Sequence, residues 1–77
     1  MILDHANLES ANFEEANFGG ANLKGAMFGG ANLKGVDFKG ASLEGAHLDH
    51  VDLTSVEHDD KTKTDGATHE GSPGAWW

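Results

Sequence analysis

Large apolar residues recur at every fifth position along most of this chain. From Leu8 onward, a small apolar residue, Ala or Val, stands two positions before each of them. The large apolar positions are Leu3, Leu8, Phe13, Phe18, Leu23, Phe28, Leu33, Phe38, Leu43, Leu48 and Leu53. They include every Leu and every Phe of the chain, so the spacing is an internal repeat. We expect these side chains to form the structural core.

A period of five fits neither regular element. In an α-helix, five residues advance about 500°, so the large residues would spiral around every side. In a straight strand, an odd period would send successive large residues to opposite faces. Glycine ends each repeat from Gly20 to Gly45, as a turn with positive φ would require. The pattern therefore predicts a chain that bends once per repeat and coils into a solenoid around a narrow apolar interior.

The successive units ANLES, ANFEE, ANFGG, ANLKG, AMFGG, ANLKG, VDFKG, ASLEG, AHLDH and VDLTS resemble the pentapeptide-repeat family. The resemblance covers residues 1 to about 57. It implies an all-β fold, the right-handed quadrilateral β-helix with four pentapeptides per coil. On that geometry residues twenty apart stack, and the regular repeats make just under three coils. We therefore expect a pentapeptide-repeat β-helix over residues 1–58.

Stacking at this interval would bring opposite charges into outward columns. Lys24 would lie between Asp4 and Glu44, and Lys39 would lie toward Asp59. Exposed pairs of this kind contribute about 0–1 kcal/mol each, so we interpret the columns as a solvated face. In the column that starts at Asn12, we expect the polar side chains to bond mainly to their own turns.

Residues 59–77 form a polar tail that contains no Leu, Ile, Val or Phe. The unit ATHEG (67–71) looks like a degenerate repeat, one residue out of phase. We therefore expect residues 59–71 to form an irregular last coil or cap. The chain ends in Trp76 and Trp77, which would cover an open end of the solenoid or contact a partner; a frayed terminus is the alternative.

Composition narrows the class of function. The 77 residues hold five Lys and Arg against thirteen Asp and Glu, for a formal charge of −8. This acidity argues against direct binding of nucleic acid. No apolar run is long enough to span a membrane, and no signal peptide is visible, so we expect a cytoplasmic protein. The chain has no Cys, which excludes disulfides and thiolate metal sites.

Candidate chemistry is sparse. His47, Asp49 and His50 lie close together in the sequence, but no second cluster of ligands converges on them. We find no nucleophile elbow and no phosphate-binding loop. The sequence therefore predicts no catalytic residue, no bound metal and no cofactor, and we expect a protein that is not an enzyme.

Two functions remain in view at this stage, beside the simpler reading that the chain is a fragment or accessory module of a larger protein. The first is a structural module that presents a rigid, acidic surface to a protein partner that the sequence does not identify, and that forms homodimers through its solenoid ends. The second follows from the family resemblance, because some pentapeptide-repeat proteins mimic duplex DNA and bind DNA gyrase. The acidity suits both functions, whereas the shortness of the rod and its lysines suit the second less well.

Overall fold

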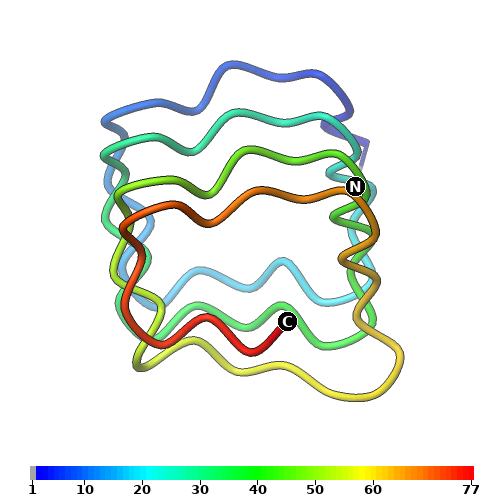
Figure 1. The fold of residues 1–77 in the computed structure, drawn as a ribbon. Helices are drawn as coiled ribbons and strands as arrows, with labels where there is room; N and C mark the ends of the chain where they lie inside the picture. The colour runs from blue at the N-terminus through cyan, green and yellow to red at the C-terminus, as the bar shows by residue number, and fades with distance from the viewer. Residues whose placement is uncertain (1) are drawn as a thin grey trace.

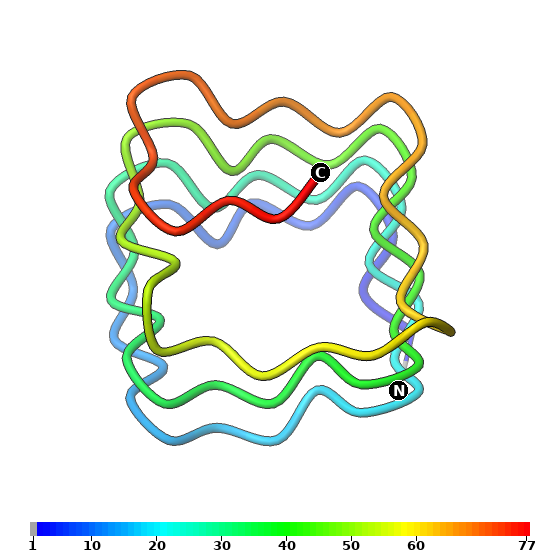
Figure 2. The ribbon, with the colours of Figure 1, turned by 60° about the horizontal axis from the view of Figure 1, so that its bottom comes forward.

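A computed structural model describes residues 2–77, and Met1, the first residue of the predicted repeat domain, lies outside them. The chain winds as a β-solenoid with a four-sided outline, which Figure 2 shows nearly end-on. The coils stack along the axis (Figure 1). Residues 2–77 contain no α-helix, and hence no helix that could cross a membrane.

No extended strand forms within the described residues, because each side of the solenoid carries only a single-residue parallel bridge to the next coil. The bridges are Ile2–Asn22, Asn7–Met27, Asn12–Asn32, Asn17–Asp37, Asn22–Ser42, Met27–His47, Asp37–Glu57, Ser42–Lys63 and His47–Thr68. The first seven join residues twenty apart, as the stacking of pentapeptides requires. We number the coils as the first (residues 2–20), second (21–40), third (41–61) and fourth (62–77).

The last two bridges join residues 21 apart, so one extra residue enters the chain between Glu57 and Lys63. This extra residue lies where the chain swings out at one corner, in the yellow part of Figure 1. Beyond it the backbone pairs again, and Thr68 lies beside His47 as the out-of-phase unit ATHEG suggests. The solenoid path thus continues past residue 58 into a fourth coil of polar sequence.

Each repeat bends at a corner, and from His5 to His50 the second residue of every corner adopts positive φ, whereas Ser55 in the next repeat does not. The six repeat glycines have φ values of 67–71°. Four other residues occupy this conformation without the freedom of glycine: His5, Ser10, Glu15 and His50, at 58–64°. An L-residue with a Cβ atom pays roughly 1–2 kcal/mol there, so these corners carry local strain.

The adjacent residues Glu14 and Glu15 allow this strain to be measured. Replacing Glu15 by Gly should leave the free energy of unfolding unchanged or raise it by up to about 1 kcal/mol, because relief of the positive φ offsets the greater entropy of the unfolded chain. Glu14 has no positive φ, so Glu14→Gly should lower that free energy by about 0.5–1 kcal/mol at the same change in charge. Urea unfolding of both variants measures the difference; equal losses would contradict the argument.

The corners are also held by polar side chains of the column that starts at Asn12. The Oδ1 atoms of Asn12 and Asn32 accept the backbone N–H groups two residues later, at 3.0 and 3.1 Å. In addition, Asn32 Nδ2 donates to Asn12 Oδ1 at 3.2 Å. The expected turn bond therefore forms, and it coexists with a side-chain ladder between the first two coils.

The buried core starts at Phe18 and fills the second and third coils. The ring of Phe28 is fully buried, with centroid distances of 5.9–6.3 Å to Phe13, Phe18 and Phe38. Phe18 and Phe38, twenty residues apart, stack at 5.8 Å. The second and third coils hold the buried core because each has a neighbouring coil on both sides.

Fewer ion pairs form between the stacked charges than the sequence suggested. The only ion pair among residues 2–77 joins Lys39 Nζ to Glu57 Oε1 at 3.1 Å. Asp59 lies at the corner of Lys39 as expected, where its Oδ1 accepts the Gly40 N–H at 3.1 Å, but the ion pair that Lys39 forms is with Glu57. Both partners of the ion pair are more than half exposed, so it adds little stability.

Candidate functional site

The structure separates the eleven expected core residues into two groups. Eight are buried: Phe18, Leu23, Phe28, Leu33, Phe38, Leu43, Leu48 and Leu53. The other three, Leu3, Leu8 and Phe13, belong to the first coil and are only half-buried. The N-terminal end of the solenoid therefore leaves apolar side chains accessible to solvent.

This N-terminal end also leaves backbone groups free. In the second coil, the N–H of Met27 donates to Ala6 O at 2.9 Å, and its carbonyl accepts from Leu8 N at 2.8 Å. The corresponding groups of Asn7, Asn12 and Asn17 in the first coil have no backbone partner among the described residues. Unpaired groups of this kind are a template for pairing with another chain. The acidic side chains of the first coil surround this edge: Asp4, Glu9, Glu14 and Glu15.

The C-terminal end is covered. Trp76 stacks on His58 with ring centroids 4.0 Å apart and planes 5° apart. Trp77 lies edge-on to His69, and its Nε1 donates to Ala67 O at 3.0 Å. Both tryptophans pack against the buried core and are half-buried. Trp76 and Trp77 therefore lie against the C-terminal end of the solenoid.

Polar side chains of the tail satisfy backbone groups of the coils before it. Thr62 Oγ1 donates to Phe38 O at 2.9 Å. Ser72 Oγ donates to Leu48 O and accepts the Val51 N–H, the latter at 3.0 Å. The tail thereby replaces apolar burial with hydrogen bonds, which explains how a segment without Leu or Phe can close this end.

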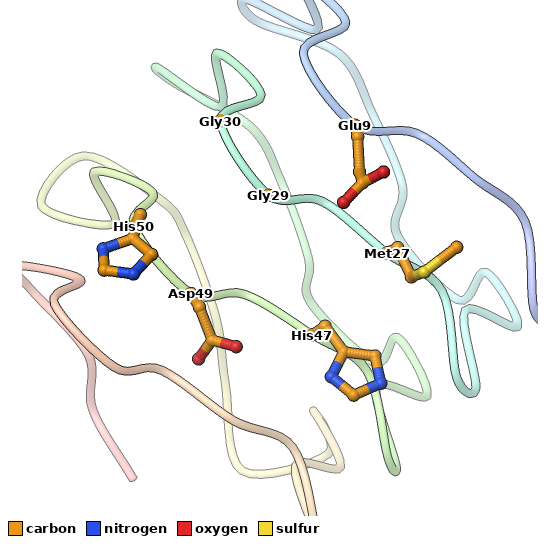
Figure 3. Close-up of a pocket in the computed structure, with 7 residues that line it drawn as sticks. All are labelled: Glu9, Met27, Gly29, Gly30, His47, Asp49 and His50. Carbon is orange, nitrogen blue, oxygen red and sulfur yellow. The ribbon is translucent and has the colours of Figure 1, made fainter.

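A depression of about 420 Å³ lies on one face of the solenoid. Its lining residues come from the first three coils: Glu9, Met27, Gly29, Gly30, His47, Asp49 and His50. Gly29 and Gly30 form its floor. They have no side chains, whereas the corners stacked on either side of them carry Glu9 in the first coil and Asp49 and His50 in the third. Figure 3 shows the Glu9 side chain pointing from the first coil toward Gly29 and Met27.

Asp49 is tied to the fourth coil. Its Oδ1 accepts the Glu70 N–H at 2.7 Å, and its Oδ2 accepts from Thr68 Oγ1 at 2.9 Å. Desolvation raises the pKa of Asp49, but these two bonds and the nearby His47 and His50 outweigh it, so the pKa lies below its usual value. Asp49 is thus an ionised anchor for the last coil.

The two histidines beside Asp49 do not complete a metal site. No group of three or more His, Asp or Glu side chains within residues 2–77 is arranged to hold a metal ion. His47 contacts Thr68, with its Nδ1 3.4 Å from Oγ1, and His50 lies at a corner with positive φ. These residues contribute to the surface of the solenoid.

Comparison with known proteins settles the family. The family described as pentapeptide repeats, in eight copies, matches residues 2–40 and 31–57. This chain belongs to the pentapeptide-repeat family. The matched part covers the first two coils and most of the third, which are the coils whose bridges keep the spacing of twenty residues. No curated protein sequence matched the chain.

Solved structures of the family share this solenoid. HetL from Nostoc, described as involved in regulation of heterocyst differentiation, is 28% identical with a TM-score of 0.69, over 94% of this chain and 35% of HetL. Rfr23 from Cyanothece is 37% identical with a TM-score of 0.51, over 84% of this chain and 51% of Rfr23. This pentapeptide-repeat chain therefore spans about a third to a half of their length.

A third similar structure is QnrB1, a plasmid-mediated fluoroquinolone resistance protein, with 23% identity and a TM-score of 0.64, over 88% of this chain and 37% of QnrB1. At that identity the likeness concerns the fold. Another similar protein comes from the thylakoid lumen of Arabidopsis. The cytoplasmic location expected for this pentapeptide-repeat chain stays a prediction.

Sequence reasoning missed the depression and the anchoring of Asp49. The signal for the depression was present, because Gly29 takes the corner position that Lys24, Lys34 and Lys39 take on the other faces of the second coil. The Asp49 contacts depend on the extra residue near position 60, which shifts Thr68 into place by a distance that no repeat pattern specifies.

Proposed function

We propose that this chain is a non-enzymatic interaction module that presents a rigid, acidic surface to protein partners and self-associates through its N-terminal end. The observation that carries the proposal is the difference between the two ends. Half-buried Leu3, Leu8 and Phe13 and unpaired backbone groups lie at the N-terminal end, whereas Trp76 and Trp77 cover the other. A module with one open end would form a closed dimer about a two-fold axis rather than a filament.

The size of the end predicts a weak dimer. The molecule extends 22 Å along each principal axis. An end of that size offers roughly 500 Å² per copy, so roughly 1,000 Å² in total, which is near the lower bound for a specific interface. The acidic side chains around the edge would also face those of the second copy and repel them. Association should therefore be measurable only at high micromolar concentration.

Salt should strengthen this association. Raising the ionic strength from about 20 mM to about 500 mM shortens the screening length several-fold and weakens the repulsion between the two acidic rims. Sedimentation equilibrium of the whole chain at both ionic strengths should show a larger dimer fraction at the higher one. A monomer under both conditions would contradict the self-association, and a dimer weakened by salt would contradict the N-terminal interface.

A variant pair tests whether the free backbone edge is used. Asn7→Pro removes an N–H that has no backbone partner in the fold, so it should abolish the dimer. The turn bond from Asn7 Oδ1 to the Glu9 N–H is lost as well, and Asn7→Ala is the control because it removes that bond but keeps the N–H. Equal dimerisation of the two variants would show that the edge donor plays no part.

The alternative proposal is a DNA mimic that binds a DNA-binding protein such as DNA gyrase. The formal charge of −8 supports it, as does a shared fold with a fluoroquinolone resistance protein. A supercoiling assay separates the two proposals, because only a mimic should inhibit the enzyme. Full supercoiling at excess protein would exclude the alternative.

We also propose the finer geometry that the family implies: a right-handed quadrilateral β-helix with just under three regular coils and without catalytic activity. Bridges between residues twenty apart support four pentapeptides per coil. A crystal structure of the chain would test the handedness.

A further inference from the structure

The second coil carries a lysine at the first corner position on three of its four sides. These residues are Lys24, Lys34 and Lys39, and on the remaining side the position is Gly29. Carboxylates lie above and below the glycine, since Glu9 and Asp49 stand at the same position in the first and third coils. Lys24 has a carboxylate in both neighbouring coils, and Lys34 and Lys39 each have one, so the side at Gly29 has two stacked carboxylates and lacks the lysine between them.

The missing lysine leaves the depression described above. A Cβ atom built on Gly29 would lie 3.4 Å from Glu9 Oε2, so the carboxylate reaches over the vacant corner. The Glu9 carboxylate takes part in no hydrogen bond or ion pair with any residue between positions 2 and 77. By contrast, the Asp49 carboxylate is already bonded to the fourth coil and contributes only its charge. The site is thus an open hollow with one unused anion.

The lining chemistry is that of a site for a long cationic side chain. Met27 offers a half-buried, polarizable thioether, and the Gly29–Gly30 turn lines the depression without side chains. Lys and Arg side chains lay their methylene stems along apolar surface and keep the charged group at a polar rim. Their charge complements both Glu9 and the net acidity of the chain.

We propose that a lysine or arginine side chain from an extended basic segment of a protein partner occupies this depression, in place of the lysine that the second coil lacks. The stem lies over Met27 and the glycines, and the cationic group pairs with the Glu9 carboxylate. This inference rests on the proposed function, since it names the partner chemistry of an interaction module, but it uses a face of the solenoid rather than an end.

The test is a titration of the whole ¹⁵N-labelled chain with an acetylated and amidated Gly-Gly-Arg-Gly-Gly peptide, followed by NMR. We expect the amide shifts to concentrate at Gly29, Gly30 and their neighbours. A peptide with neutral citrulline in place of arginine should cause none of these shifts. Shifts spread evenly over the acidic surface, or equal shifts with citrulline, would overturn the proposal, as would equally tight binding of spermidine.

Two variants and one control locate the site. Gly29→Lys completes the lysine pattern and should weaken peptide binding at least about tenfold, because its own side chain fills the hollow. Gly29 does not have positive φ, so this variant should keep its melting temperature. Glu9→Gln should weaken binding about threefold, as expected for an exposed ion pair. Glu14→Gln, the same change on the neighbouring face, should leave affinity unchanged.

The outcomes keep this proposal separate from self-association. Equal affinities of Glu9→Gln and Glu14→Gln, or unchanged binding by Gly29→Lys, would overturn the depression as the site even if the chain dimerises. A chain that stays monomeric but binds the arginine peptide at Gly29 would support the site and refute the dimer. Sedimentation and titration on the same samples therefore decide the two questions independently.

Discussion

Replacing Phe28 with alanine should lower the free energy of unfolding by about 3–5 kcal/mol. The ring is fully buried in the second coil and packs against three other phenylalanine rings at centroid distances of 5.9–6.3 Å. The lost side chain leaves a cavity that the backbone cannot close, because hydrogen bonds hold it in place: the Phe28 N–H donates to His47 O at 2.9 Å, and Phe28 O accepts the Ala31 N–H at 2.8 Å. For a domain of this size that loss is a large share of the total stability.

Phe13→Ala is the matched control for Phe28→Ala. Phe13 makes the same kind of edge-on ring contacts, but it lies in the first coil and is only half-buried. Its loss should therefore be about half as large, since solvent already reaches the ring. Urea unfolding followed by circular dichroism gives both values. Equal losses would contradict the view that stability concentrates in the inner coils, and Phe28→Leu, which costs less, extends the series if Phe28→Ala does not fold.

Gly74→Ala should detach the C-terminal segment and lower the free energy of unfolding by about 2–4 kcal/mol. A Cβ atom on Gly74 would lie 2.5 Å from both the Cα and N atoms of Thr54, and φ at Gly74 is 84°. The clash is with backbone, so no side-chain rotation relieves it. Moving the segment breaks the bond from Leu53 N to Pro73 O at 2.8 Å and uncovers the core beneath the two tryptophans.

Gly45→Ala separates this clash from the cost of positive φ. Gly45 has φ of 69°, but a Cβ atom there would meet nothing within 4 Å, so the expected loss is only about 1–2 kcal/mol. Trp76 and Trp77 are the only tryptophans in the chain, so their fluorescence reports on the segment alone. We expect a red-shifted emission for Gly74→Ala and an unchanged emission for Gly45→Ala.

Deleting residues 72–77 sets the upper limit of this effect. If Gly74→Ala acts by releasing the segment, deleting the segment should lower the melting temperature at least as much as Gly74→Ala does. An unchanged melting temperature after the deletion would show that the two tryptophans do not stabilise the end. The proposal of a closed dimer would then lose the support that it draws from a covered C-terminal end, because both ends would be equally open.

The regular coils were predictable because their information is local. Five-residue spacing, alternating Ala and Leu, and glycine at the corners identify the bend, and the bend identifies which residues face inward. The half-burial of Leu3 and Phe13 was not predictable to the same degree, because it depends on how many coils lie on either side. The pairing of Lys39 with Glu57 instead of Asp59 likewise depends on side-chain reach across an irregular corner.

The tail shows most clearly what could not be predicted from the sequence. Its composition excludes an apolar ladder, and the unit ATHEG indicates a shifted register, but neither feature determines where Trp76 comes to rest. That position follows from a close backbone approach at Gly74, from stacking on His58 and from the bond of Trp77 to Ala67. The first two contacts join the fourth coil to the third, and the last joins two sides of the fourth coil, so their distances are set only when the coils are stacked.

The sequence by itself therefore determined the repeat, the family, the inward face and the acidic outer surface of this protein. Only the tertiary structure decided that one end is covered and the other open, and that the face at Gly29 is hollow beside Glu9. The physical reason is that a five-residue repeat specifies the direction of every side chain, whereas an end or a hollow exists only where stacking stops or where one stacked position lacks a side chain.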